Sequence, residues 1–214
     1  MTPRSPVTAA ADTPLPATGS HVTTFAVDGP FGVVRGAATD RGLALLVLPG
    51  SDWERQLAPL VQATNAHEGD HPAARELRDY LAGERREFGS PLDLCLVRGN
   101  FGRVVLARLA EVPFGALVTY GELARAAGRP GAARAVGGAV GRNPLPIVIP
   151  CHRVIAADGR LGGFSAGLPN KRALLALEGH TVDAAASSRG PRSGTDEDAW
   201  SHARVSGRGA AHGG

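Results

Sequence analysis

Residues 132–155 read AARAVGGAVGRNPLPIVIPCHRVI, and this stretch decides how the surrounding chain is organised. Its first part predicts a helix of alanine, glycine and valine from which one long side chain, Arg134, projects. Its second part predicts a short apolar strand, residues 147–149, that ends at a proline without a backbone donor. Cys151 and His152 follow that proline. The stretch therefore places a thiol and an imidazole side by side after an apolar segment.

The residues immediately upstream predict a second short helix. Thr119 precedes YGELARAAG as a helix N-cap, and the turn at residues 128–131 ends that helix. Two short helices joined by a glycine-containing turn form a helix-turn-helix. A helix of small residues can approach another surface closely, but it can equally pack tightly inside a domain, so the pattern leaves both interpretations open.

The basic residues are concentrated in the same half of the 214-residue chain. Residues 120–172 contain eight Lys or Arg and two acids, whereas residues 21–119 contain ten Arg and twelve acids. A concentrated positive patch is typical of proteins that bind a polyanion such as nucleic acid. An arginine-rich solvated surface is the alternative.

The first half of the chain predicts a small α+β unit. Apolar alternation and turn residues predict an antiparallel meander, and Ser51 with Glu54 forms a capping box ahead of an amphipathic helix. The predicted elements are strands at 21–27, 31–38, 43–48 and 92–97 and helices at 51–64 and 72–81. Cys95 has apolar neighbours in its predicted strand, so we expect a buried structural thiol there.

These patterns together predict an α+β chain. A small N-terminal antiparallel-sheet and helix domain occupies residues 21–97, and a mostly helical C-terminal domain with the helix-turn-helix and Cys151 occupies residues 98–180. The compositions of residues 1–20 and 181–214 predict a disordered leader and a disordered tail. No apolar run is long enough to cross a membrane and no secretory signal is recognisable, so we expect a cytoplasmic protein with two free thiols and no membrane partner.

Cys151 can be either a nucleophile or an inert buried thiol. A reactive thiolate needs positive or hydrogen-bonding neighbours, which His152 and Arg153 can supply. Because adjacent residues on an extended strand point to opposite faces, a contact between Cys151 and His152 requires a turn or a bridging water. Glu178, at the end of the helix KRALLALEG, is the best-placed acid to orient His152 in the manner of a triad.

The sequence HEGDH at residues 67–71 combines two histidines and two acids, which could bind zinc. No further cluster of recognisable spacing completes a four-ligand set. The simpler interpretation is the start of a helix at Pro72. We therefore expect no metal and no cofactor.

Three segments together carry a family resemblance. The stretch at 132–155, GGFSAGL at 162–168 and KRALLALEGH at 171–180 closely resemble the active-site half of the O6-alkylguanine-DNA alkyltransferases, which move an alkyl group from damaged guanine onto their own cysteine. The likeness continues through VPFGALVTYGELA and covers about residues 25–180. It implies a DNA repair protein that is consumed by one reaction, because water does not cleave the thioether product.

The resemblance also implies a role for each active-site residue. Cys151 attacks the alkyl carbon, and His152 draws off the thiol proton through a water. Glu178 holds and polarises His152. Asn143 matches the hinge asparagine that steadies the active-site segment, and Tyr120 matches the tyrosine that donates a proton to the departing guanine ring.

The implied partner is double-stranded DNA containing O6-alkylguanine, bound by a monomer through the minor groove, with the damaged base flipped out of the helix. Arg134 matches the arginine that enters the vacated space, and Ser165 matches the serine that hydrogen-bonds the O6 oxygen. The small neighbours of Arg134 permit a close approach. The full set of expected DNA-contacting residues is Ala132, Ala133, Arg134, Gly137, Arg142 and Ser165.

The sequence departs from the family pattern at the expected pocket. Phe164 stands where many relatives carry tyrosine, and Ala166 replaces a glycine. Two other functions fit part of the sequence. Alkyltransferase-like proteins bind damaged DNA without repair, but they carry tryptophan at the position of Cys151. A cysteine hydrolase using Cys151, His152 and Glu178 leaves Arg134 and the basic half without a purpose.

Overall fold

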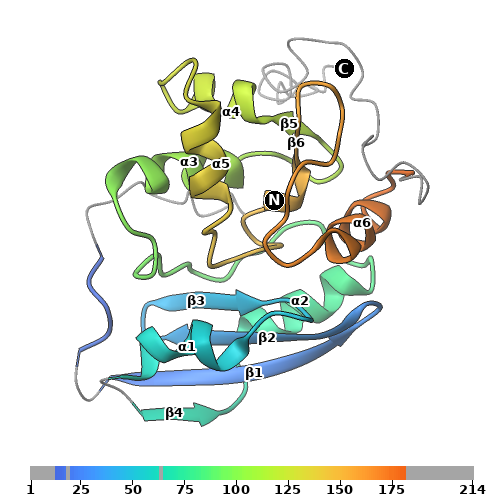
Figure 1. Ribbon diagram of the computed structural model, residues 1–214. Coiled ribbons are helices and arrows are strands. Elements are labelled where there is room, and N and C mark those ends of the chain that lie inside the picture. Colours follow the sequence, from blue (N-terminus) through green and yellow to red (C-terminus); the bar gives the residue numbers. More distant parts are fainter. Residues whose placement is uncertain (1–12, 18–19, 63–64, 182–214) are drawn as a thin grey trace, which may run out of the picture.

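A four-stranded sheet forms the base of the N-terminal half (Figure 1). The computed structural model describes residues 13–17, 20–62 and 65–181. The predicted antiparallel meander is confirmed, with β1 (His21–Gly29), β2 (Gly32–Thr39) and β3 (Gly42–Val47) paired in sequence order. A fourth strand, β4 (Asn65–Glu68), pairs in parallel with the outer edge of β1.

The strand β4 was missed by the sequence analysis, which considered part of it as a metal site. His67 lies within β4, on an exposed sheet edge. His71 instead caps helix α2 (Pro72–Leu81), where its Nδ1 accepts a hydrogen bond from the backbone N–H of Ala73 at 3.2 Å. The helix start predicted at Pro72 is thus confirmed, and its cap is an imidazole.

Helix α1 (Trp53–Val61) has its N-cap one residue later in the sequence than predicted. Asp52 is the N-cap, and its carboxylate accepts the backbone N–H of Arg55 at 3.0 Å. Ser51 belongs to the preceding turn, because its own N–H donates to the carbonyl of Leu48. The capping box at Ser51 and Glu54 was therefore wrong, although the amphipathic helix is present.

The predicted strand at residues 92–97 was also wrong. Leu92 makes an isolated bridge to Leu43, and the chain then turns. The Asp93 carboxylate accepts the N–H of Cys95 at 3.1 Å, which stabilises the turn in place of a sheet ladder. Cys95 is buried as predicted, and burial raises the pKa of its thiol to about 11. A thiol in that state is structural.

The C-terminal half is mostly helical, with one small parallel pair of strands. Thr119 caps its helix as predicted, in a full capping box with Glu122. The glycines at 128 and 131 both have positive φ, which shapes the turn of the helix-turn-helix. The elements are α3 (Asn100–Ala110), β5 (Val118–Thr119), α4 (Tyr120–Ala126), α5 (Ala133–Val140), β6 (Val154–Ile155) and α6 (Leu168–Leu177).

The two halves share one hydrophobic core. Alternate residues of β3 face opposite ways, so that Leu45 packs with α1 while Leu46 joins the larger cluster formed by α2 and the C-terminal helices. The backbone N–H of Leu46 also donates to the carbonyl of Pro144 at 2.8 Å. The sheet therefore directly supports the segment that leads to Cys151. No described helix is both long enough and apolar enough to cross a bilayer.

Part of the predicted leader packs against the N-terminal unit. The carbonyl of Pro14 accepts a hydrogen bond from the Arg41 guanidinium at 2.8 Å, and Pro16 is buried. Residues 1–12 and 18–19 of the leader, and all of the predicted tail except residue 181, lie outside the described residues.

Candidate active site

Residues 144–149, just before Cys151, form turns and not the strand predicted at residues 147–149. The N–H of Ile149 donates to the carbonyl of Leu145 at 2.8 Å, and Ile147 adopts a φ of 75°, in the left-handed region. Prolines at 144, 146 and 150 lack the donors that a strand needs to pair on both edges, which explains the difference. The turn leads into the 3₁₀ helix η1 (Cys151–Arg153).

Asn143 fastens both ends of this turn. Its Nδ2 donates to the carbonyl of Ile149 at 2.8 Å, while its Oδ1 accepts the N–H of Leu145 at 3.0 Å. One side chain therefore holds the residues on either side of the left-handed Ile147. The position predicted as a hinge is, in geometry, a clamp on the active-site segment.

Cys151 lies at the start of η1 and is only 5% exposed. Burial raises the pKa of its thiol to about 11. The Asn143 side chain, the Lys171 cation and the local backbone N–H groups lower it by less than burial raises it. The resting thiol is therefore protonated at neutral pH, and a nearby base must take its proton when it reacts.

The 3₁₀ helix η1 turns the His152 ring toward a buried carboxylate. Its Nε2 lies 2.9 Å from Oε1 of Glu178, and both side chains are fully buried. Burial lowers the pKa of His152, which favours the neutral ring. Since a carboxylate can only accept, the neutral ring donates from Nε2 and presents Nδ1 as the acceptor. Nδ1 is buried without a hydrogen-bond partner among the described residues.

Glu178 is held from several sides at once. The guanidinium of Arg153 binds it through Nε at 2.9 Å and Nη2 at 2.6 Å, and the N–H of Gly115 donates at 3.0 Å. Tyr80 donates its hydroxyl to Oε1 at 2.7 Å. Burial alone would raise the pKa of Glu178, but hydrogen bonds and charges from His152 and Arg153 outweigh it and hold this pKa well below its usual range. The Glu178 carboxyl group is thus ionised at neutral pH.

Two groups near this network were missed by the sequence analysis. Tyr80 comes from α2, about a hundred residues away in the chain, and no local pattern points to it. Lys171 was seen only as part of a motif, yet its side chain is fully buried and its Nζ donates to the carbonyls of Val154 and Leu161. Burial lowers the pKa of Lys171 to about 8.

The phenol of Tyr120 lies within electrostatic reach of the Cys151 thiol. Burial raises the pKa of its phenol, and the negative charge of a Cys151 thiolate raises it further. Gly137 and Gly162 approach its ring, and a Cβ at Gly162 would come within 3.3 Å of the phenol oxygen. Small residues at both positions therefore leave room for the tyrosine beside the thiol.

A pocket of about 550 Å³ opens beside the site, between the Asn143 turn and helix α1. Ser165, Phe164 and Ala166 contribute to its walls together with Asn143. Cys151 is not among the lining residues. The structure thus brings Ser165 to the Asn143 turn, but the pocket does not reach the thiol.

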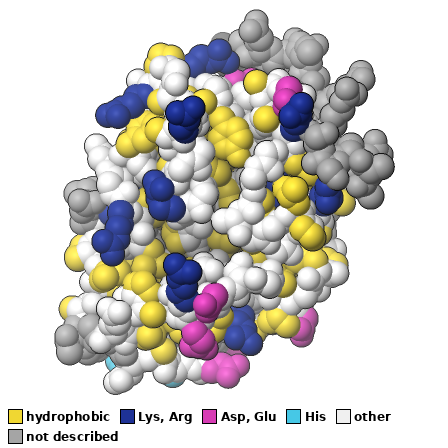
Figure 2. All heavy atoms as spheres, viewed as in Figure 1, with side chains coloured by type: hydrophobic (Ala, Val, Ile, Leu, Met, Phe, Trp, Pro, Cys, Tyr) yellow, Lys and Arg dark blue, Asp and Glu magenta, His cyan; other side chains and the backbone are white. Residues whose placement is uncertain are grey.

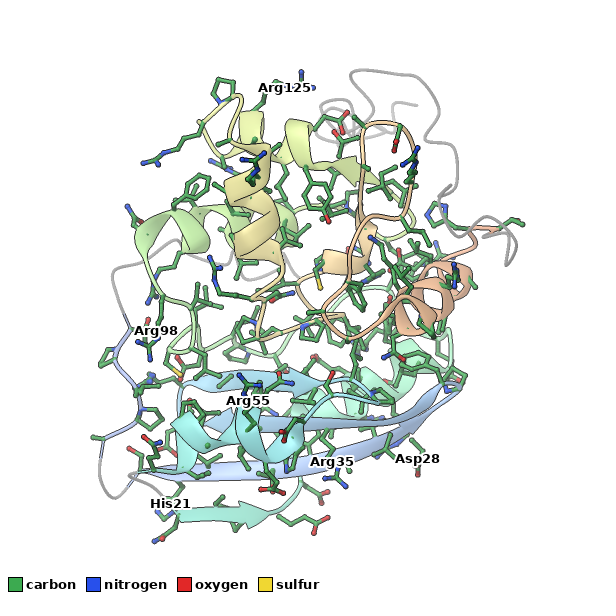
Figure 3. All side chains as sticks on the ribbon, viewed as in Figure 1. His21, Asp28, Arg35, Arg55, Arg98 and Arg125 are labelled. Atoms are coloured by element: carbon green, nitrogen blue, oxygen red, sulfur yellow. The ribbon has the colours of Figure 1, made fainter. Side chains whose placement is uncertain are left out.

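Five of the six predicted DNA-contacting residues, all except Ser165, lie on α5 or directly beside it in the chain. Arg134 and Arg142 are exposed, and Ala132, Ala133 and Gly137 are half-buried. Figure 2 shows the molecule from the same side as Figure 1. Lys and Arg side chains are spread over the part of this face that contains α3, α4 and α5, while most Asp and Glu side chains lie toward the sheet. In Figure 3, Arg125 marks the far end of this region. The structure thus presents the small-residue helix on a basic surface.

Known proteins of one kind match this chain. Residues 100–180 match the family described as the 6-O-methylguanine DNA methyltransferase, DNA binding domain. A methylated-DNA–protein-cysteine methyltransferase of Mycolicibacterium paratuberculosis is 44% identical over 153 residues, which cover 71% of this chain and 89% of that protein.

Solved structures agree with these sequence matches. Mycobacterium tuberculosis OGT in complex with DNA superposes with a TM-score of 0.64 at 38% identity, covering 80% of this chain and 95% of that one. The O6-methylguanine-DNA methyltransferase of Pyrococcus kodakaraensis gives a TM-score of 0.58 at 28% identity, covering 74% and 99%. Because the family match, a relative 44% identical over most of its length and the solved structures all agree, this chain belongs to the methylated-DNA–protein-cysteine methyltransferase family.

Proposed function

We propose that this protein repairs DNA by transferring an alkyl group from the O6 oxygen of guanine to its own Cys151. One observation carries the proposal: a protonated buried thiol precedes a histidine whose Nε2 is held by Glu178 and whose Nδ1 remains an acceptor. The family of its relatives names the same acceptor, a protein cysteine.

The reaction follows from this arrangement. A water between Cys151 and Nδ1 of His152 carries the thiol proton to the ring, and Glu178 stabilises the imidazolium that forms. The Cys151 sulfur attacks the alkyl carbon as the bond from that carbon to the guanine oxygen breaks, and the bonding electrons leave with the base. Tyr120 gives a proton to the departing guanine ring, and Ser165 hydrogen-bonds its oxygen.

The thioether product leaves Cys151 alkylated. A thioester can be hydrolysed, but a thioether has no carbonyl for water to attack. Each molecule therefore reacts once.

Recognition of the base requires that it leave the duplex, since its O6 atom lies within the stack. We place α5 in the minor groove, with Ala132, Ala133 and Gly137 against the DNA and Arg134 in the space left by the flipped base. Arg142 is exposed just after the end of α5, and it contacts the phosphate backbone of the DNA next to the flipped base. The exposure of Arg134 and the small residues around it support this placement. One monomer suffices for the reaction, and the two free thiols suit the cytoplasm.

Mass spectrometry after incubation with duplex DNA that contains O6-methylguanine tests the proposal. We expect the intact protein to gain the mass of one CH₂ group, located by peptide mapping on Cys151. Cys95 is the internal control, because its buried thiol lacks a paired histidine and should stay unmodified. Tight DNA binding without any mass change would instead indicate a protein that recognises damage without repairing it.

A further inference from the structure

We infer that Tyr80 is a positioning residue for alkyl transfer, which acts on His152 through the carboxylate of Glu178. This inference rests on the proposed function and assigns part of it to the sheet-bearing half of the chain. Tyr80 lies on α2, outside the region that matches the family's DNA binding domain.

The contact is direct and completely buried. Tyr80 has no exposed surface, and its hydroxyl donates to Oε1 of Glu178 at 2.7 Å. The same oxygen accepts from Nε2 of His152 at 2.9 Å and from Nη2 of Arg153 at 2.6 Å. Nε of Arg153 lies 3.1 Å from it as well, so donors from three side chains share one oxygen atom.

The tyrosine ring lies among other aromatic side chains, while its hydroxyl position is set by Glu178. Phe88 packs against the tyrosine with ring centroids 5.4 Å apart, and Phe114 meets it edge-on at 6.1 Å. The guanidinium groups of Arg86 and Arg153 lie over Phe114 at 5.2 Å and 5.9 Å. Because burial and the nearby Glu178 charge raise the pKa of Tyr80, its phenol remains a donor.

Sharing an acceptor has a predictable effect on His152. Each donor that Oε1 accepts draws electron density from it and weakens its attraction for the other donors. The charged and titratable groups that act on the imidazole are Glu178, Arg153 on η1, Lys171 on α6 and, through Glu178, Tyr80. With the others unchanged, loss of the Tyr80 hydroxyl leaves Glu178 a stronger acceptor for an imidazolium. His152 then stays protonated to a higher pH and cannot take the thiol proton there.

The variant Tyr80→Phe keeps the ring and removes only the hydroxyl. Phe88→Leu is the matched control, because it disturbs the same aromatic packing without touching Glu178. Two quantities are measured in the full chain: the titration of the His152 ring by NMR, and the single-turnover rate of methyl transfer from O6-methylguanine duplex as a function of pH. For Tyr80→Phe we expect both the titration midpoint and the acid limb of the rate profile to move up by about one pH unit.

Phe88→Leu should leave both midpoints where they are in the unaltered protein. A Tyr80→Phe profile that coincides with that of the unaltered protein, or an equal shift in Phe88→Leu, would overturn the inference. A lower melting temperature with unmoved midpoints would do the same, since it indicates a merely structural contact. If the unaltered protein transfers no methyl group, the proposed function fails, while the NMR titration still decides the role of Tyr80.

Discussion

Replacing Glu178 with glutamine is expected to lower the free energy of unfolding by about 3–5 kcal/mol, because it leaves the Arg153 charge buried without its counter-ion. The new amide would also direct a donor at side chains that are themselves donors. The same change removes the group that stabilises the His152 imidazolium, so methyl transfer should slow by about 10²-fold or more. Urea denaturation and single-turnover kinetics at pH 7 measure the two effects.

The acid dependence of stability gives a second readout of the same variant. The pKa of Glu178 is depressed in the folded protein, so its contribution is present above the unfolded value of about 4.3 and is lost as the pH falls through the folded value. Below about pH 4, the free energy of unfolding of Glu178→Gln should therefore fall less steeply with decreasing pH than that of the unaltered protein.

Glu111→Gln is the control for the change of charge alone. Glu111 pairs with Arg108 at 3.0 Å on the surface, where both side chains are more than 40% exposed. Its loss should cost less than about 1 kcal/mol. Equal destabilisation by the two variants would contradict a special role for the buried Glu178 cluster.

Replacing Arg134 with alanine is expected to slow repair of duplex DNA by about 10–100-fold, since the side chain no longer offsets the few kcal/mol that flipping costs. Reaction with free O6-benzylguanine, which needs no flipping, should change by less than about threefold, because Arg134 is exposed whereas the Glu178 network is buried. Both rates are measured in single turnover under the same conditions.

Arg125→Ala is a matched control, because it removes one arginine from α4 in the same basic region (Figure 3). It should weaken duplex binding modestly, as loss of a phosphate contact does, without separating the two substrates. An Arg134→Ala variant that loses both activities equally would show that Arg134 acts on the chemistry and not on the flipped state.

Features set by neighbouring residues were predictable from the sequence. The N-cap at Thr119 formed as predicted, and the structure adds Glu122 to it in a capping box, because these hydrogen bonds close within one helical turn. Helix α2 and the three-strand meander likewise depend on local periodicity and turns. The cap of α1 was misplaced by one residue, because Ser51 and Asp52 are both good caps and the turn after β3 uses Ser51.

Features set by distant contacts were not predictable. The exposed strand β4 has no apolar alternation and exists because β1 offers it an edge. Residues 147–149 are apolar enough for a strand, but their surrounding prolines and the Asn143 clamp fold them into a turn. That turn and η1 direct the His152 ring toward Glu178. The predicted extended strand did not indicate this direction.

The residues of the candidate site were likewise predictable only in part. Cys151, His152 and Glu178 were found from residue chemistry and the family motif, and the structure joins the last two directly. Tyr80 and the buried donor Lys171 carry no signature, because a tyrosine in an amphipathic helix and a lysine at a helix start are common.

Single transfer to Cys151 is tested most directly by counting turnovers with an excess of duplex DNA that contains radiolabelled O6-methylguanine. We predict a rapid rise to about one methyl group per protein molecule, no further reaction and no labelled methanol in solution. Cys151→Ser should acquire no label while still binding the duplex. Release of free methanol through repeated turnovers, or label on the Cys151→Ser protein, would contradict the account.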